Sequence, residues 1–96
     1  MSLTVVAFIK SRAGKEAEVE RALRNLVPPT RAEAGCINYL LHRSQTDHGL
    51  FLFFEDWASR EALDRHLSMP YLEDFLARVD QLLERPVDIQ LFDKLE

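Results

Sequence analysis

Two segments of the sequence, residues 3–10 (LTVVAFIK) and residues 50–57 (LFLFFEDW), are apolar at both their odd and their even positions. Both are also rich in β-branched or aromatic side chains, which favour strands. Successive side chains of a strand point to opposite faces of a sheet, so each of these strands must be covered on two sides. This requirement constrains the fold more than any other feature of the sequence.

The remaining elements follow from periodicity and from turn residues. From Lys15 the apolar side chains recur at helical spacing, and Pro28 and Pro29 are expected to break or kink this helix. The spacing of Thr30 and Glu33 predicts a capping box that starts a further turn. The other predicted elements are a strand over residues 36–43, a hairpin loop over 44–49, a helix capped by Ser59, a helix from Pro70 to 85–86, and a final strand over 87–91.

This order of elements predicts an α+β fold of the ferredoxin-like, split βαβ type in a single domain, residues 1–96. Its four-stranded antiparallel sheet carries the helices on one face, because right-handed crossovers place them on the same side. The other face then presents apolar side chains such as Val6, Phe8, Leu52 and Phe54, a larger patch than soluble monomers normally expose. We therefore expect a homodimer through the open sheet face; the alternative is a monomer whose terminal residues fold over the sheet.

Charge and motif content exclude several classes of protein. Twelve Lys and Arg against sixteen Asp and Glu give a net charge of −4, which argues against a nucleic-acid partner. The sequence has no apolar run of about 18 residues and no secretory leader pattern, so we expect no membrane span and a cytoplasmic location. No metal site and no internal disulfide are expected, because His42, His48 and His66 lack local metal-site spacing and Cys36 is the one cysteine.

His66 and Glu55 are the candidate catalytic residues. His66 lies on the apolar stripe of its predicted helix, so its imidazole either makes a quiet hydrogen bond in the core or exchanges a proton in a cavity. Glu55 shares a strand face with Phe53 and Trp57, where a carboxylate needs a partner. An ion pair with Arg43 at the sheet edge is the competing interpretation of Glu55.

Four further side chains are candidates for binding a substrate. The indole N–H of Trp57 is a donor that can orient a ligand. Tyr39 and Asn38 point to opposite faces of their strand, so at most one of them can share a pocket beneath the helices. His42 lies on the same face as Asn38 and either joins it at the pocket or faces a subunit interface.

Motifs along nearly the whole chain resemble one family. The segments 33–39 (EAGCINY), 53–57 (FFEDW) and 66–70 (HLSMP) are similar to the antibiotic biosynthesis monooxygenase family, including its small quinol monooxygenases. The resemblance implies a ferredoxin-like domain that pairs into a dimeric α/β barrel. It also implies oxygenation of quinols or electron-rich aromatic molecules without metal, flavin or haem. Relatives that degrade haem use a first-strand asparagine, which LTVVAFIK lacks, so haem degradation is not expected here.

The sequence thus predicts a cofactor-independent monooxygenase that oxidises a small quinol, hydroxylated aromatic or polyketide-like substrate with O2. His66 is the expected base and Glu55 its orienter or proton acceptor, with Trp57 and either Tyr39 or Asn38 positioning the substrate. One alternative is an isomerase or tautomerase of a small carbonyl compound that uses the same acid and base. Another is a non-catalytic, ligand-binding stress-response dimer in which His66 is only a satisfied core residue.

Overall fold

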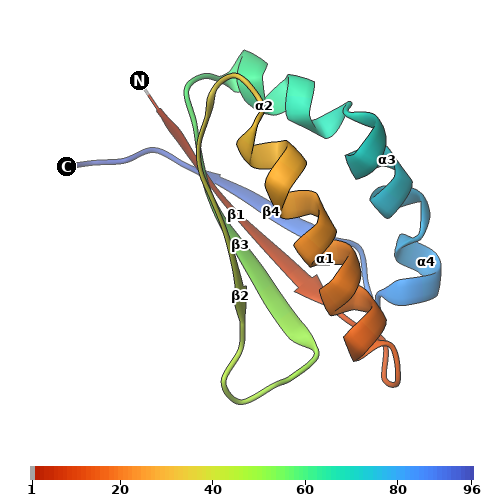
Figure 1. Cartoon of the computed structure of the whole chain (residues 1–96). Coiled ribbons are helices and arrows are strands. Elements are labelled where there is room, and N and C mark those ends of the chain that lie inside the picture. The colour runs from red at the N-terminus through yellow and green to blue at the C-terminus, as the bar shows by residue number, and fades with distance from the viewer. Residues whose placement is uncertain (1) are drawn as a thin grey trace.

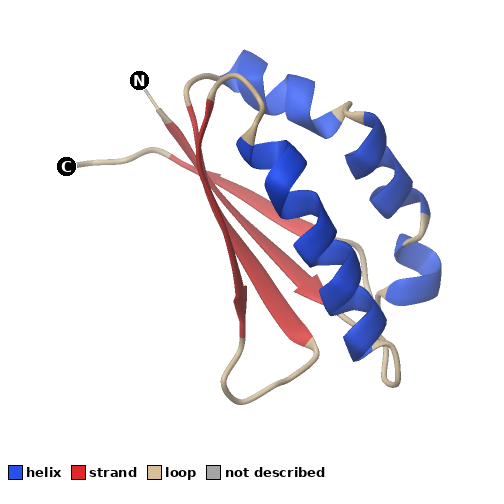
Figure 2. Ribbon diagram, viewed as in Figure 1, coloured by secondary structure: helices blue, strands red, loops and turns tan. Residues whose placement is uncertain are grey.

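The computed structural model describes residues 2–96, which form two layers, a four-stranded antiparallel sheet and a layer of helices on one of its faces (Figures 1 and 2). The strands lie in the order β2-β3-β1-β4. The elements along the chain are β1 (Leu3–Lys10), α1 (Glu16–Arg31), β2 (Cys36–Arg43), β3 (Leu50–Trp57), α2 (Arg60–Leu67), α3 (Pro70–Ala77), α4 (Val79–Leu82) and β4 (Asp88–Phe92). The predicted ferredoxin-like α+β fold is confirmed.

The two strands that are apolar on both faces lie next to each other in the middle of the sheet. On β1, the side chains of Val5, Ala7 and Ile9 face the helices and are at most 5% exposed. The intervening Val6 and Phe8 face the other way and are only partly buried. The helices therefore cover one apolar face of these strands and leave the second one open.

Helix α1 continues through both prolines to Arg31, so of the expected break or kink at Pro28 and Pro29 the break is wrong. The prolines lie in the last turn, where the backbone groups that they leave unpaired are close to the helix end and can reach solvent. The backbone N–H of Ala32 closes this end by donating to the carbonyls of Pro28 and Pro29. Thr30 is an interior residue of α1, so the predicted capping box with Glu33 is also wrong.

The second half of the chain agrees more closely with the predicted elements. The hydroxyl of Ser59 accepts a hydrogen bond from the backbone N–H of Ala62 at 3.1 Å, which confirms the predicted cap of α2. The helix expected from Pro70 to residues 85–86 is divided into α3 and α4 by a turn at Arg78. None of the helices within residues 2–96 is long and apolar enough to cross a membrane.

The open face of the sheet is apolar at its centre, as the sequence predicts. Leu40 and Phe54 are 40% and 37% exposed. Beside them on the same face lie the half-buried side chains of Val6, Phe8 and Leu52. The C-terminal tail after β4 projects away from the sheet (Figure 1), and its Leu95 is 95% exposed. The described terminal residues therefore leave this face uncovered, contrary to the alternative of a monomer closed by its own ends.

Candidate active site

His66 is held inside the layer between helices and sheet by α2. The whole residue is 2% exposed, and its imidazole lies against two aromatic rings of the sheet. The ring centroids are 4.7 Å apart for Trp57 and His66 and 5.5 Å apart for Tyr39 and His66. The inward orientation predicted from the helical stripe is therefore correct, and two aromatic contacts restrict the plane of the imidazole.

The carboxylate that contacts His66 is Glu33, a residue that sequence reasoning did not select. Glu33 follows the end of α1, and its Oε2 lies 2.9 Å from Nδ1 of His66. The hydroxyl of Tyr71, from α3, donates to the same Oε2 atom. The side chains of Glu33 and His66 are 6% and 3% exposed, so this is a buried contact. Among the described residues Glu55 has no hydrogen bond to His66, so Glu33 is the orienting neighbour, and the role of Glu55 as proton acceptor stays a prediction.

Gly35 allows the turn that carries Glu33 to approach α2. A Cβ atom at position 35 would lie only 2.6 Å from the Cβ of Ala62, and the φ angle of Gly35 is +88°, in the left-handed region. The backbone carbonyl of Gly35 accepts a hydrogen bond from the N–H of Ala58 at 2.8 Å, just before α2. Only glycine meets both the conformational and the steric requirement, so the sequence EAG delivers the Glu33 carboxylate to His66.

Glu55 is a second buried carboxyl group, at the end of β3, and is 4% exposed. Burial raises its pKa from 4.5 to about 7; the indole N–H of Trp57, which donates to Oε1 at 2.8 Å, opposes this rise, and the nearby negative charge of Glu33 adds to it. The competing ion pair between Glu55 and Arg43 is not formed. Arg43 instead contacts Glu20 and lies over the ring of Phe51.

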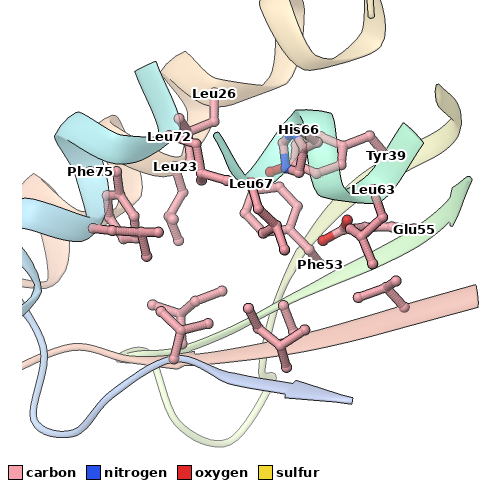
Figure 3. Close-up of a pocket in the computed structure, with 16 residues that line it drawn as sticks. Leu23, Leu26, Tyr39, Phe53, Glu55, Leu63, His66, Leu67, Leu72 and Phe75 are labelled. Carbon is pink, nitrogen blue, oxygen red and sulfur yellow. The ribbon is translucent and has the colours of Figure 1, made fainter. Parts of the chain in front are cut away.

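A small apolar cavity of about 40 Å³ lies between the sheet and helices α1, α2 and α3 (Figure 3). Three polar side chains contribute to its wall, namely Glu55, His66 and Tyr39. The rest of the lining is aliphatic or aromatic and includes Val5, Phe53, Leu63, Leu67, Leu72 and Phe75. A proton acceptor in such a place reacts with little competition from solvent water.

The four predicted substrate-binding residues separate between the two faces of the sheet. Tyr39 lines the cavity, where burial raises the pKa of its hydroxyl above the ordinary value. Trp57 lies behind His66 and is fully buried. Asn38 and His42 belong to the open face, where Asn38 donates to Oδ2 of Asp56 at 3.0 Å and His42 is exposed. A place for Asn38 or His42 in the cavity is therefore ruled out.

The register of β2 explains this separation. A bulge between Cys36 and Asn38 places one extra residue, Ile37, on β2 where β3 has none. Beyond the bulge, Tyr39 pairs with Glu55, and both face the helices.

Within residues 2–96, no three His, Cys, Asp or Glu side chains gather as a metal site. The cavity thus brings together acid–base groups on an apolar background, which is suited to removing a proton from a weakly acidic organic molecule.

Comparison with known proteins yields one consistent result. Residues 2–78 match the profile of a family described as antibiotic biosynthesis monooxygenase. A Mycobacterium tuberculosis protein, provisionally named as a monooxygenase, is 35% identical over 98% of this chain and 92% of its own length. An uncharacterized Synechocystis protein is 34% identical over 94% of this chain, which spans 61% of that longer protein.

Solved structures agree with the sequence comparison. A Pseudomonas aeruginosa protein superposes with a TM-score of 0.94 at 38% identity, covering 99% of this chain and 95% of its own. The Mycobacterium tuberculosis structure has a TM-score of 0.93 at 33% identity, covering 100% of this chain and 97% of its own. The matched residues 2–78 include His66, Glu33 and Glu55, so the similarity extends over the cavity as well as the sheet.

Proposed function

Because this chain belongs to the antibiotic biosynthesis monooxygenase family, we propose that it is a monooxygenase that oxidises a small quinol, hydroxylated aromatic or polyketide-like molecule with O2 and without a cofactor. The observation that carries the proposal is the presence of both His66 and Glu55 on the wall of one apolar cavity. The pKa of Glu55 is raised to about 7 by burial, and an imidazole is the side chain that most often serves as a general base.

The proposed chemistry uses electrons of the substrate alone. His66 removes the acidic proton of the bound molecule, with Glu55 as a second acceptor, and the resulting anion is oxidised by O2 in a place from which bulk water is excluded. For a methylene centre flanked by aromatic rings, the methylene group and one molecule of O2 give a carbonyl group and one molecule of water. One oxygen atom enters the product, and the other leaves with the two methylene hydrogens as water.

The charge of the cavity favours a neutral substrate. No lysine or arginine contributes to the cavity wall formed by the described residues, whereas Glu55 lines it and Glu33 lies directly behind His66. A phosphorylated or carboxylated molecule would meet negative charge without a compensating cation. We therefore expect a phenol or quinol that enters uncharged and is ionised only after binding.

The proposal includes a homodimer as the functional unit. The apolar centre of the open face, formed by residues such as Phe8, Leu40 and Phe54, is continuous across the three strands β1, β2 and β3. A second copy offers the same apolar surface, so two sheets can cover each other face to face about a two-fold axis. The helices already occupy the other face, so this pairing would leave the cavity on the far side of each sheet.

An oxygen-electrode assay tests the function. Metal-free protein is mixed with anthrone and with a panel of quinols, and we expect O2 consumption that falls by at least about 100-fold in His66→Ala, as for the loss of a general base. The matched control is His48→Ala, because His48 is an exposed histidine of the β2–β3 loop. Lack of oxygen consumption with every substrate, or unchanged turnover in His66→Ala, would refute the proposal. Product formed equally well without oxygen would instead indicate an isomerase or tautomerase.

A further inference from the structure

Three side chains from separate parts of the chain form a partly buried set of hydrogen bonds beside the cavity. Tyr71 comes from α3, Glu33 from the turn after α1, and His66 from α2. We infer that Glu33 and Tyr71 are positioning residues that hold the proton of His66 on Nδ1, so that a bare Nε2 serves as the base. This inference rests on the proposed function for its catalytic consequence, but not for the position of the proton.

One carboxyl oxygen of Glu33 contacts two polar neighbours. Both Nδ1 of His66 and the hydroxyl of Tyr71 contact Oε2 of Glu33. An ionised carboxylate oxygen can accept from both neighbours, whereas a carboxyl group protonated on Oε2 would donate to a bare Nδ1 and leave the imidazole proton on Nε2. The carboxylate form therefore satisfies both neighbours at once.

Tyr71 is suited to be a permanent donor in this set of hydrogen bonds. Burial, together with the hydrogen bond to Glu33 and its negative charge, raises the pKa of Tyr71 to about 12, so its hydroxyl keeps its proton at neutral pH. Its oxygen also lies 3.4 Å from the carbonyl of Pro29 at the end of α1. Because the hydroxyl remains protonated, it can donate to Oε2 of Glu33, and Nδ1 of His66 is the other polar atom in contact with that oxygen.

Nδ1 of His66 contacts Glu33, which is not part of the cavity wall, so Nε2 is the nitrogen that we place toward the cavity. A neutral imidazole carries one proton, and an ionised Glu33 requires that proton on Nδ1. His66 lines the cavity and Glu33 does not, and Nε2 makes no hydrogen bond to any other residue in the described range 2–96. Contact with the Trp57 ring restricts rotation of the imidazole, so Nε2 is presented in one direction. An orienting carboxylate behind a catalytic histidine selects the productive tautomer in the same manner in other enzymes.

The tautomer can be measured directly in protein with ¹⁵N-labelled histidine. Long-range ¹H–¹⁵N correlation spectra distinguish protonated from bare imidazole nitrogens, and spectra of His42→Asn and His48→Asn identify the signals of the other two histidines. We expect His66 to be protonated at Nδ1 at pH 7.5. In Glu33→Gln, whose amide can also donate to a bare Nδ1, we expect a mixture of the two tautomers.

Activity supplies the second measurement. In Glu33→Gln we expect kcat to fall by about 10- to 100-fold with little change in KM, as is typical when a supporting hydrogen-bond partner is removed. Tyr71→Phe retains the carboxylate, so we expect the same tautomer as in the wild type and a loss of only about two- to tenfold. The matched control is Glu61→Gln, an exposed residue of α2 that loses the same charge.

The outcomes separate this inference from the proposed function. A proton on Nε2 in the wild type, or identical tautomer populations in the wild type and Glu33→Gln, would overturn the role of Glu33 whatever the activity. If no tested quinol or anthrone is oxidised but Glu33→Gln still redistributes the tautomers, the positioning inference stands and the proposed reaction fails. A response of the His66 signals to Glu61→Gln equal to that of Glu33→Gln would also overturn it, because a general charge effect would then suffice.

Discussion

Replacement of Glu55 by glutamine should change how the stability of the protein depends on pH. The carboxyl group of Glu55 has a pKa of about 7 in the folded chain, mainly through burial, against 4.5 for an unperturbed group. Below pH 4.5 the group is protonated in both the folded and the unfolded chain, so burying it does not lower the free energy of unfolding there. As the pH rises toward 7, the unfolded chain releases the proton first, and the free energy of unfolding decreases.

The magnitude follows from the two pKa values. A tenfold difference in proton affinity is worth about 1.4 kcal/mol, so the wild type should lose about 3 kcal/mol of unfolding free energy between pH 4.5 and pH 8 because of Glu55 alone. Glu55→Gln cannot ionise, but it keeps an oxygen that can accept from the indole N–H of Trp57. The unfolding free energy of the variant minus that of the wild type should therefore increase by about 3 kcal/mol as the pH rises from 4.5 to 8.

Urea unfolding followed by tryptophan fluorescence measures this difference, because Trp57 is the one tryptophan and lies in contact with Glu55. Both proteins are unfolded at the same concentration at a series of pH values, so that any dimerisation affects them equally. Glu61→Gln serves as the control, since an exposed carboxyl group should give a flat difference across the range. A flat difference for Glu55→Gln as well would show that the buried carboxyl group is not shifted, and the argument for its role near neutral pH would fail.

Three further predictions concern other contacts. Trp57→Phe removes the hydrogen bond that lowers the pKa of Glu55, so the acidic limb of the pH–activity profile should move to higher pH; an unmoved limb would contradict a role for ionised Glu55. Sedimentation should give twice the monomer mass of 11.1 kDa for the wild type and the monomer mass for Phe54→Lys, and a monomeric wild type would refute the dimer. In thermal unfolding, Gly35→Ala should lower the free energy of unfolding by about 1–3 kcal/mol more than Gly14→Ala does. Both glycines have φ near +88°, but only a Cβ atom at position 35 would meet another Cβ atom at 2.6 Å. Equal losses in the two variants would contradict this prediction.

The strands were predictable because their signals are local. Alternation of apolar side chains and the residues of the turns determine where residues 3–10, 36–43 and 50–57 begin and end, and the structure has the same bounds. The helix through Pro28 and Pro29 was not predictable in this way. Whether two prolines interrupt a helix depends on how far the helix extends beyond them, and no local pattern indicates that α1 ends at Arg31.

The candidate site was predictable only in part, for a similar reason. His66 and Glu55 could be selected because each is a polar residue on an otherwise apolar face of its own element. Glu33 lies 33 positions before His66, and no periodicity connects them. Its one sequence signal is an acidic side chain just before Gly35, which also fits a helix cap. By contrast, Trp57 and Glu55 are two residues apart on one strand face, so their hydrogen bond could have been anticipated.

The size of the cavity constrains how a substrate can reach these groups. A volume of about 40 Å³ has room for a few water molecules or for O2, whereas a cavity that binds benzene measures about 150 Å³. An aromatic substrate must therefore displace part of the wall. His66 and Glu55 are deeply buried, but Leu76 of α3 and Ile89 of β4 also line the cavity and are each 39% exposed. We therefore expect the substrate ring to lie between α3 and β4 with its acidic group leading toward His66, which selects molecules that carry that group at one end.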